Sequence, residues 1–252
     1  MLTEKSEVQS VKKLSKNIYL IKILSSGIAQ SGKPGQFCNI KVSATNYPLL
    51  RRPFSICRIK GEFIYFLFDT HGEGTNILAN KKKGEILDIL GPLGNGFDLN
   101  VEYDTAVIVA GGIGAAPFPF LLDKMGNKRE VISFVGGRSE ENLITYGLKN
   151  IFLSTDDGSY GFKGNVVQLV EKTKNKFAGK KVQFFACGPN VMLKSLKEFC
   201  ITNNFECQIS TESAMACGFG ICQGCPIPAS NEEKYYLICK DGPVFNAKDV
   251  IV

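Results

Sequence analysis

The chain has 252 residues, 44% of them hydrophobic, which at about 100–150 residues per domain predicts two or three folded units of ordinary globular composition. Its net charge of +6 comes from lysines and arginines spread along the chain without interleaved aromatic residues, which argues against a nucleic-acid-binding surface. No run approaches the ~18 apolar residues of a membrane span and the N-terminal residues lack the apolar core of a signal peptide, so we expect a cytoplasmic protein without a membrane partner.

Residues 1–100 are predicted to form a small antiparallel β-barrel domain. Short apolar runs, separated by Gly, Pro or Asn, fall at residues 17–24, 36–42, 54–59, 63–69 and 85–91. Short strands at such spacing, with turn residues between them, are typical of small antiparallel barrels.

Two motifs of this unit suggest a cradle for an anion and a flavin. The stretch Arg51–Ser55 places guanidinium groups, a rigid proline, an aromatic ring and a hydroxyl on consecutive positions at a strand edge. The stretch His71–Asn76 follows the next strand closely and offers a glycine loop and a helix N-terminus suited to a pyrophosphate. Taken singly, the first motif also fits a surface turn, and the second fits a helix cap in which Thr75 bonds a backbone N–H.

The pattern changes at Thr105 to alternating strands and helices. Apolar strands are predicted at residues 106–112, 130–137, 150–155 and 181–188, and helices at residues 115–125, 164–175 and 190–203. Such alternation indicates βαβ units with a parallel sheet. We therefore predict a Rossmann-like dinucleotide domain over residues 101–205.

Two glycine motifs end predicted strands of this domain, where open α/β sheets bind ligands. One contains Gly112 and Gly114, whose positions permit a tight turn and expose backbone N–H groups. The other contains Cys187 and Gly188. Together they predict a nicotinamide dinucleotide site, although a buried thiol is an alternative for Cys187. The stretch 136–141 supplies both a phosphate-seeking arginine and ribose-binding carboxylates, so the residues leave NAD versus NADP open.

The C-terminal segment, residues 206–252, is predicted to be a small module that carries a metal cluster. Its cysteines repeat the C-x4-C-x2-C…C spacing of plant-type [2Fe-2S] sites, with Cys217, Cys222, Cys225 and Cys239. Intervening glycines would let the loop curl and aim its N–H groups at sulfur. Zinc is the main alternative, but structural zinc sites usually pair two short cysteine knuckles. The core of the segment is small, so we expect the bound group to organise it.

The other cysteines do not extend this pattern. A secreted disulfide scaffold would require a short, exported chain with evenly scattered cysteines, and that does not describe this chain. Four cysteines sit singly in apolar surroundings and are interpreted as buried small hydrophobic residues, namely Cys38, Cys57, Cys200 and Cys207.

On these motifs the chain resembles the ferredoxin-reductase-like flavoproteins, whose barrel carries an Arg-Pro-aromatic-Ser motif and then a Gly-Thr or Gly-Ser phosphate loop. The resemblance implies FAD contacts from Arg52, Pro53, Phe54, Ser55, Leu67, Phe68, Asp69, Gly74 and Thr75. It implies NAD contacts from Gly112, Gly114, Cys187 and Gly188, with Ser55 and Cys187 as the catalytic pair. An arginine often stands in the family where this chain has Asp69.

The order of barrel, dinucleotide domain and compact cluster module narrows the resemblance. The wording ESAMACGFGICQGCPIP, followed by ICKDGPVFNAKDVI, is similar to the family of electron-transfer subunits of NAD-dependent dihydroorotate dehydrogenase, class B. The resemblance spans essentially the whole chain. It implies an FMN-containing catalytic partner in a heterotetramer of two of each, with electrons passing from FMN through [2Fe-2S] and FAD to NAD+ in pyrimidine biosynthesis.

Two other functions fit the same modules. The chain could be the small subunit of an NADPH:ferredoxin oxidoreductase or of a hydrogenase, which shares all three units. A different class is a redox-responsive regulatory protein that holds flavin and cluster without turnover, although it would leave the dinucleotide motif unused. The identity of the partner distinguishes a dihydroorotate dehydrogenase subunit from the small subunit of an oxidoreductase or hydrogenase. NADH-to-dye reductase activity would exclude the regulatory protein.

Overall fold

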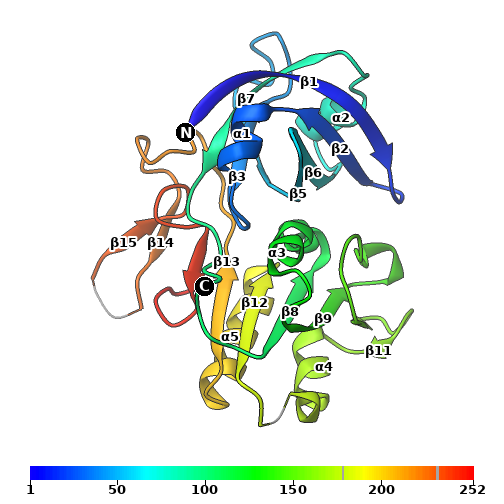
Figure 1. The fold of residues 1–252 in the computed structure, drawn as a ribbon, viewed down its shortest axis with the longest axis vertical. Helices are drawn as coiled ribbons and strands as arrows, with labels where there is room; N and C mark the ends of the chain where they lie inside the picture. The colour runs from blue at the N-terminus through cyan, green and yellow to red at the C-terminus, as the bar shows by residue number, and fades with distance from the viewer. Residues whose placement is uncertain (178, 231–232) are drawn as a thin grey trace.

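The structure, a computed structural model, describes residues 1–177, 179–230 and 233–252. It contains a curled antiparallel sheet, a mostly parallel α/β sheet and a small C-terminal hairpin that lies beside both (Figure 1). In this part of the chain, no helix combines the length and the apolar character that crossing a bilayer requires.

The N-terminal unit is a seven-stranded antiparallel sheet with the order β4-β3-β7-β1-β2-β6-β5. It curls around an apolar core that includes Val8, Ile21, Ile40 and Phe66. The predicted antiparallel unit is confirmed, in the form of a half-barrel (Figure 1). Its elements are β1 (Leu2–Lys13), β2 (Ile18–Leu24), α1 (Ser26–Ser31), β3 (Phe37–Lys41), β4 (Arg52–Ser55), β5 (Arg58–Lys60), β6 (Phe63–Asp69), α2 (Glu73–Ala79) and β7 (Ile86–Leu93).

The second sheet has the order β11-β10-β9-β8-β12-β13-β16, and all its neighbours are parallel except β13 and β16. The order runs one way from β8 to β9 and the other way to β12, so the carboxyl ends of these strands form the switch point at which α/β sheets bind ligands. The strands are β8 (Thr105–Gly111), β9 (Glu130–Gly137), β10 (Ile151–Thr155), β11 (Phe162–Lys163), β12 (Val182–Cys187), β13 (Glu206–Ser210) and β16 (Val244–Asn246).

Helices cover this sheet as the alternating pattern predicts. They are α3 (Phe118–Met125), α4 (Val166–Lys172) and α5 (Asn190–Thr202), with short 3₁₀ turns η1 (Gly112–Ala115), η2 (Glu140–Asn142) and η3 (Lys174–Lys176). Helix α3 lies between the sheet and the half-barrel (Figure 1), and its Phe120 is buried in the half-barrel core. Arg58 of the half-barrel makes a two-bond ion pair with Asp123 of α3, with Nε–Oδ2 2.6 Å and Nη2–Oδ1 3.1 Å. Apolar packing and this ion pair therefore connect the two units.

The C-terminal segment adds the hairpin β14 (Pro226–Pro228) and β15 (Tyr235–Leu237), together with β16 at the sheet edge. Its buried Cys225 and Cys239 belong to the same apolar cluster as Phe245 of β16 and Phe37 of the half-barrel. The small core that the sequence indicates is therefore shared with both larger units. The division at residues 100 and 205 stays a prediction, and β13 shows that the last segment begins inside the parallel sheet.

Candidate functional site

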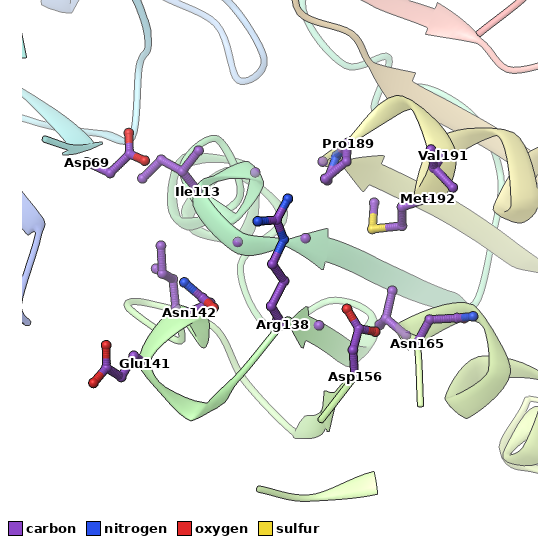
Figure 2. A pocket seen from close by; sticks show the side chains of 18 of the residues that line it. Asp69, Ile113, Arg138, Glu141, Asn142, Asp156, Asn165, Pro189, Val191 and Met192 are labelled. Atoms are coloured by element: carbon purple, nitrogen blue, oxygen red, sulfur yellow. The ribbon is translucent and has the colours of Figure 1, made fainter. Parts of the chain in front are cut away.

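A cavity of about 840 Å³ opens at the carboxyl ends of β8, β9 and β12 (Figure 2). Three predicted dinucleotide contacts line it, namely Gly112, Gly114 and Gly188. Gly112 has φ +53°, a conformation that favours glycine. A Cβ on Gly114 would lie 2.3 Å from the carbonyl oxygen of Cys187, so only glycine lets the first loop approach the end of β12.

Cys187 lies beneath this wall and does not line the cavity. Its side chain is buried, and the burial, together with the nearby carboxylate of Glu212, raises the pKa of the thiol well above its usual range. The residue is therefore a neutral thiol rather than a nucleophilic thiolate. Its predicted catalytic role stays a prediction.

Figure 2 shows Arg138 reaching from the end of β9 into the middle of the large cavity. Asp156 and Asn165 lie to the right of Arg138 in this view, and Asp69 lies on the opposite side. Among the described residues no ion pair engages the Arg138 guanidinium, so it is available to an anionic ligand. Carboxylates also line the cavity, among them Glu141 and Asp156. The cavity thus offers both kinds of group that recognise the ribose end of a dinucleotide.

A second cavity of about 300 Å³ lies against β4, β6 and the start of α2. All nine predicted FAD residues line it, from the three stretches Arg52–Ser55, Leu67–Asp69 and Gly74–Thr75. The structure therefore brings together three motifs that are separated along the chain. Their individual roles in binding FAD stay predictions.

One end of this small cavity is suited to an anion. A Cβ on Gly74 would lie 2.9 Å from Arg52 Nε, so the guanidinium packs directly against the start of α2. The first N–H groups of a helix have no partner within it. Thr75 Oγ1 accepts hydrogen bonds from the N–H groups of His71 and Gly72, which is the helix cap that the sequence offered as an alternative. The cap fixes the loop, and the arginine supplies the charge.

Four residues line both cavities, namely Asp69, His71, Ile113 and Glu212. His71 Nδ1 lies 3.2 Å from Asp69 Oδ1. Although Glu212 is open to the cavities, the surrounding protein removes much of its water, and this desolvation, followed by the Asp69 charge, raises the pKa of Glu212. The two cavities therefore meet at an acidic junction with one carboxyl of raised proton affinity.

Glu212 is not predicted from the sequence. It sits two residues after β13, in a stretch that the sequence assigns only to the cysteine module. Its position is evident only in the folded structure. Strand β13 lies beside β12, so Glu212 lies next to the end of β12, whose last residue is Cys187. A sequence pattern of local spacing does not reveal such a neighbour.

The four cysteines of the C-terminal segment gather in two pairs. Cys225 and Cys239 are buried, with their Sγ atoms 3.2 Å apart. Cys217 and Cys222 form the other pair, in which the N–H of exposed Cys222 lies 3.5 Å from Cys217 Sγ. In the described residues no group of three or more Cys, His, Asp or Glu is arranged to hold a metal ion.

Backbone N–H groups of the loop point at these sulfur atoms. Burial acts to raise the pKa of Cys217, but hydrogen bonds from the N–H groups of Cys222, Phe219 and Ile221 outweigh it and lower the pKa to about 6. Burial and the neighbouring Cys225 thiol raise the pKa of Cys239 to about 12. The loop therefore stabilises thiolate at Cys217, while Cys239 keeps its proton unless a cation replaces it.

The comparisons with known proteins agree with this geometry. A family model described as the iron-sulfur cluster binding domain of dihydroorotate dehydrogenase B matches residues 212–251. The chain is 34% identical over 262 residues to the dihydroorotate dehydrogenase B (NAD(+)) electron transfer subunit of Geobacillus sp. (strain WCH70), with 100% of each chain covered. It is 36% identical over 253 residues to the protein of the same name from Bacillus pumilus, with 96% of each covered.

Solved structures share the fold. The structure of an NADH-dependent reduced ferredoxin-NADP oxidoreductase superposes with a TM-score of 0.85 at 24% identity, covering 98% of this chain and 90% of that one. A ferredoxin NADP+ reductase from Neisseria gonorrhoeae, with bound FAD and NADP, gives a TM-score of 0.65 at 16% identity, covering 79% of this chain and 91% of that one. At these identities the likeness shows a ferredoxin-reductase-like fold.

Proposed function

The chain belongs to the family of electron transfer subunits of dihydroorotate dehydrogenase B (NAD(+)), and on this premise we propose that it connects an FMN-containing catalytic partner to NAD through a [2Fe-2S] cluster and FAD. The observation that carries the proposal is the contiguity of the three sites. The large cavity shares a wall with the small one. Strand β4, which lines the small cavity, pairs with β3, whose Asn39 contacts the loop of Cys217.

The pairing of the cysteines supports a two-iron cluster over a single zinc ion. Each iron of a [2Fe-2S] cluster takes two protein thiolates, and this chain offers one pair on the loop and one buried pair. A tetrahedral zinc site would instead bring all its sulfur ligands to roughly 3.8 Å from one another. The N–H groups aimed at Cys217 Sγ also fit a cluster whose charge the backbone stabilises.

The small cavity supports FAD. Arg52 and the first turn of α2 would hold the phosphates, while Phe54, Ser55 and the end of β6 would border the ring system. When bound, FAD supplies the conversion between the single electrons of an iron-sulfur cluster and the two-electron hydride of a nicotinamide. The chain's own contribution is to orient the ring system towards the large cavity and to exclude water at the shared wall.

The large cavity supports a nicotinamide dinucleotide, and we take it to be NAD. Asp156 and Glu141 are the groups that bond a ribose hydroxyl and repel a 2′-phosphate. Arg138 is the group that would bind such a phosphate, so its substitution would affect binding of NADPH more than binding of NADH. Gly114 and Gly188 form the close contact that leaves room for the nicotinamide end.

The catalytic partner is proposed to bind on the side of the molecule next to Cys222. Cys222 is exposed, and its neighbour Ile221 is 76% exposed. We place the partner's FMN towards this side, in a heterotetramer of two of each subunit. No residue of this chain is assigned to dihydroorotate.

Anaerobic co-expression with an FMN-containing dihydroorotate dehydrogenase tests the proposal. We expect one complex with both flavins and iron, in which dihydroorotate reduces NAD only when both subunits are present. The similar fold of the ferredoxin-NADP oxidoreductase makes a ferredoxin-reducing partner the second candidate. A complex that reduces ferredoxin but does not oxidise dihydroorotate would contradict the proposal in favour of that candidate.

A further inference from the structure

The cysteine site is attached to the half-barrel at two points, and each is made by an asparagine amide. Asn39, on β3, donates from Nδ2 to the carbonyl oxygen of Cys217 at 3.3 Å. Asn95, just beyond β7, donates from Nδ2 to the carbonyl oxygens of Lys240 at 3.3 Å and Asp241 at 2.9 Å. Each acceptor belongs to a cluster cysteine or to the residues that directly follow one, so one amide reaches each half of the site.

The contact of Asn39 is close, and Asn39 itself is buried whereas Cys217 is partly exposed. Asn39 is 0% exposed, and a Cβ added to Gly218 would lie 2.0 Å from its Nδ2. Gly218 also has φ +82°. The turn after Cys217 therefore needs glycine, both for this backbone conformation and for the close contact with the Asn39 amide. The N–H groups that point at Cys217 Sγ come directly after this turn, from Phe219 onward. The direction of those N–H groups therefore depends on where Asn39 holds the turn.

The contact of Asn95 fixes the segment after Cys239. The Asn95 N–H donates to the carbonyl oxygen of Gly242, and a Cβ on Gly94 would lie 2.4 Å from that oxygen. The two halves also meet each other, because the N–H of Gly220 is directed at the Cys239 sulfur. A shift at either asparagine would therefore move all four sulfur atoms relative to the half-barrel.

Asn39 connects the cysteine site to the strand beside β4, which lines the small cavity, and Asn95 connects it to the next strand, β7. Asn39 lies opposite Pro53 of β4 on one side and Leu90 of β7 on the other. Asn95 follows the end of the same β7. Neighbouring strands are about 4.8 Å apart, so Asn39 is a single strand spacing from the FAD motif.

Resting on the proposed function, we propose that Asn39 and Asn95 are positioning residues that set the placement of the cluster relative to the flavin. Neither side chain lines the small cavity, and neither residue is one of the predicted cysteine ligands. Their role is to hold the two peptide segments that carry the cysteines, so that electrons pass between flavin and cluster at one fixed geometry. The loss of either amide leaves a carbonyl without its donor and lets its half of the site move.

The test compares Asn39→Leu, Asn95→Ala and the double variant in the full chain loaded with FAD and iron. The readouts are the rate at which NADH reduces the flavin, the rate at which the cluster is then reduced in a single turnover, and the EPR line shape of the reduced cluster. We expect flavin reduction to be unchanged and cluster reduction to slow about fivefold for each lost hydrogen bond, with broadened EPR lines. Asn203→Ala is the matched control, because it removes a hydrogen bond from a side-chain amide to the Phe199 carbonyl oxygen on α5. It should leave both rates and the EPR line shape unchanged.

The proposal is overturned if the double variant, compared per bound cluster, keeps the wild-type rate and EPR line shape. If Asn39→Leu binds no iron, the exposed Asn95→Ala decides by the same two readouts. A wild-type chain in which NADH reduces flavin but never the cluster would instead contradict the proposed function, so the two failures are distinguishable. A purely structural role would lower thermal stability without slowing cluster reduction, and that result also counts against the proposal.

Discussion

At the scale of single residues, Glu212 connects the two cavities. It shares their common wall with Asp69, and its charge adds to the burial that raises the pKa of the Cys187 thiol. An acidic group with raised proton affinity where two cavities meet can hold or release a proton beside a group bound in either cavity. Its environment can be measured without any substrate, through the pH dependence of stability.

Glu212→Gln should become more stable relative to wild type as pH rises. Desolvation, and after it the Asp69 charge, raises the pKa of Glu212 in the folded chain. A carboxyl with a raised folded pKa contributes stability that is fully present below its unfolded pKa and is lost as pH rises through the folded value. Glu212→Gln has no carboxyl at this position, so it does not lose this stability as pH rises. Urea unfolding at a series of pH values, with flavin content matched, measures the difference.

Glu85→Gln is the control of opposite sign. Hydrogen bonds from the Lys81 side chain and the Lys82 backbone lower the pKa of Glu85, so its contribution is present at neutral pH and is lost as pH falls. The Glu85 variant should therefore be less stable than wild type at neutral pH and approach it in acid. A stability difference for Glu212→Gln that is the same at every pH would refute the assigned environment.

Cys222→Ser should remove the iron and the visible absorbance of the cluster while most FAD stays bound. Cys222 is one half of the exposed pair, whereas the residues that line the small cavity lie on other elements. Iron analysis and absorbance after gel filtration give the result. Ile221→Ser, at the adjacent exposed position, should keep the cluster and serves as the control. Full iron content in Cys222→Ser would show that the ligand set is wrong.

The site residues that the sequence predicts are those with a local spacing. The cysteine motif comes together as two pairs, and the nine residues predicted to contact FAD belong to three local motifs that the folding of β4, β6 and α2 brings to one cavity. Glu212, Asn39 and Asn95 were not predicted. Each acts through a partner far away in the chain, and only the pairing of β3, β7 and β13 brings those partners into contact.

At the scale of elements, helix α3 joins the half-barrel to the α/β sheet through the Arg58–Asp123 pair. The side chains are 15% and 39% exposed, and the contact has two bonds. A double-mutant cycle with Arg58→Ala and Asp123→Ala should give a coupling of about 0.5–1 kcal/mol in urea unfolding, because the geometry is bidentate and partly buried. The exposed Lys16–Glu141 pair, at 3.4 Å, should give a coupling near zero. Equal couplings in the two cycles would contradict this account of the joint.

Elements with a clear hydrophobic period were predicted well, and others were not. The alternating strands and helices of the second sheet lie where expected. Strand β1 was missed, although it lies between β7 and β2, because few of its residues are apolar and a bulge near Val8 breaks the alternation. The run 54–59 was expected as one strand, but the chain turns after Ser55, and β4 and β5 stand at opposite ends of the sheet order. Local pattern does not report such a turn.

At the scale of the whole molecule, the sites are neighbours. The loop of Cys217 contacts β3, β3 pairs with β4, β4 lines the small cavity, and the small cavity shares a wall with the large one. The C-terminal segment has no separate core and packs onto both larger units. The arrangement therefore places the cysteine site, the small cavity and the large cavity in the order that the proposed relay requires.

The most direct test of this relay is an anaerobic titration of the purified chain, loaded with FAD and iron, with NADH. Absorbance follows the flavin, and EPR follows the cluster in the same samples. If the relay is as proposed, NADH bleaches the flavin, and the signal of a reduced [2Fe-2S] cluster then appears without any partner subunit. A flavin that is fully reduced while the iron stays EPR-silent, at every NADH concentration, would contradict it.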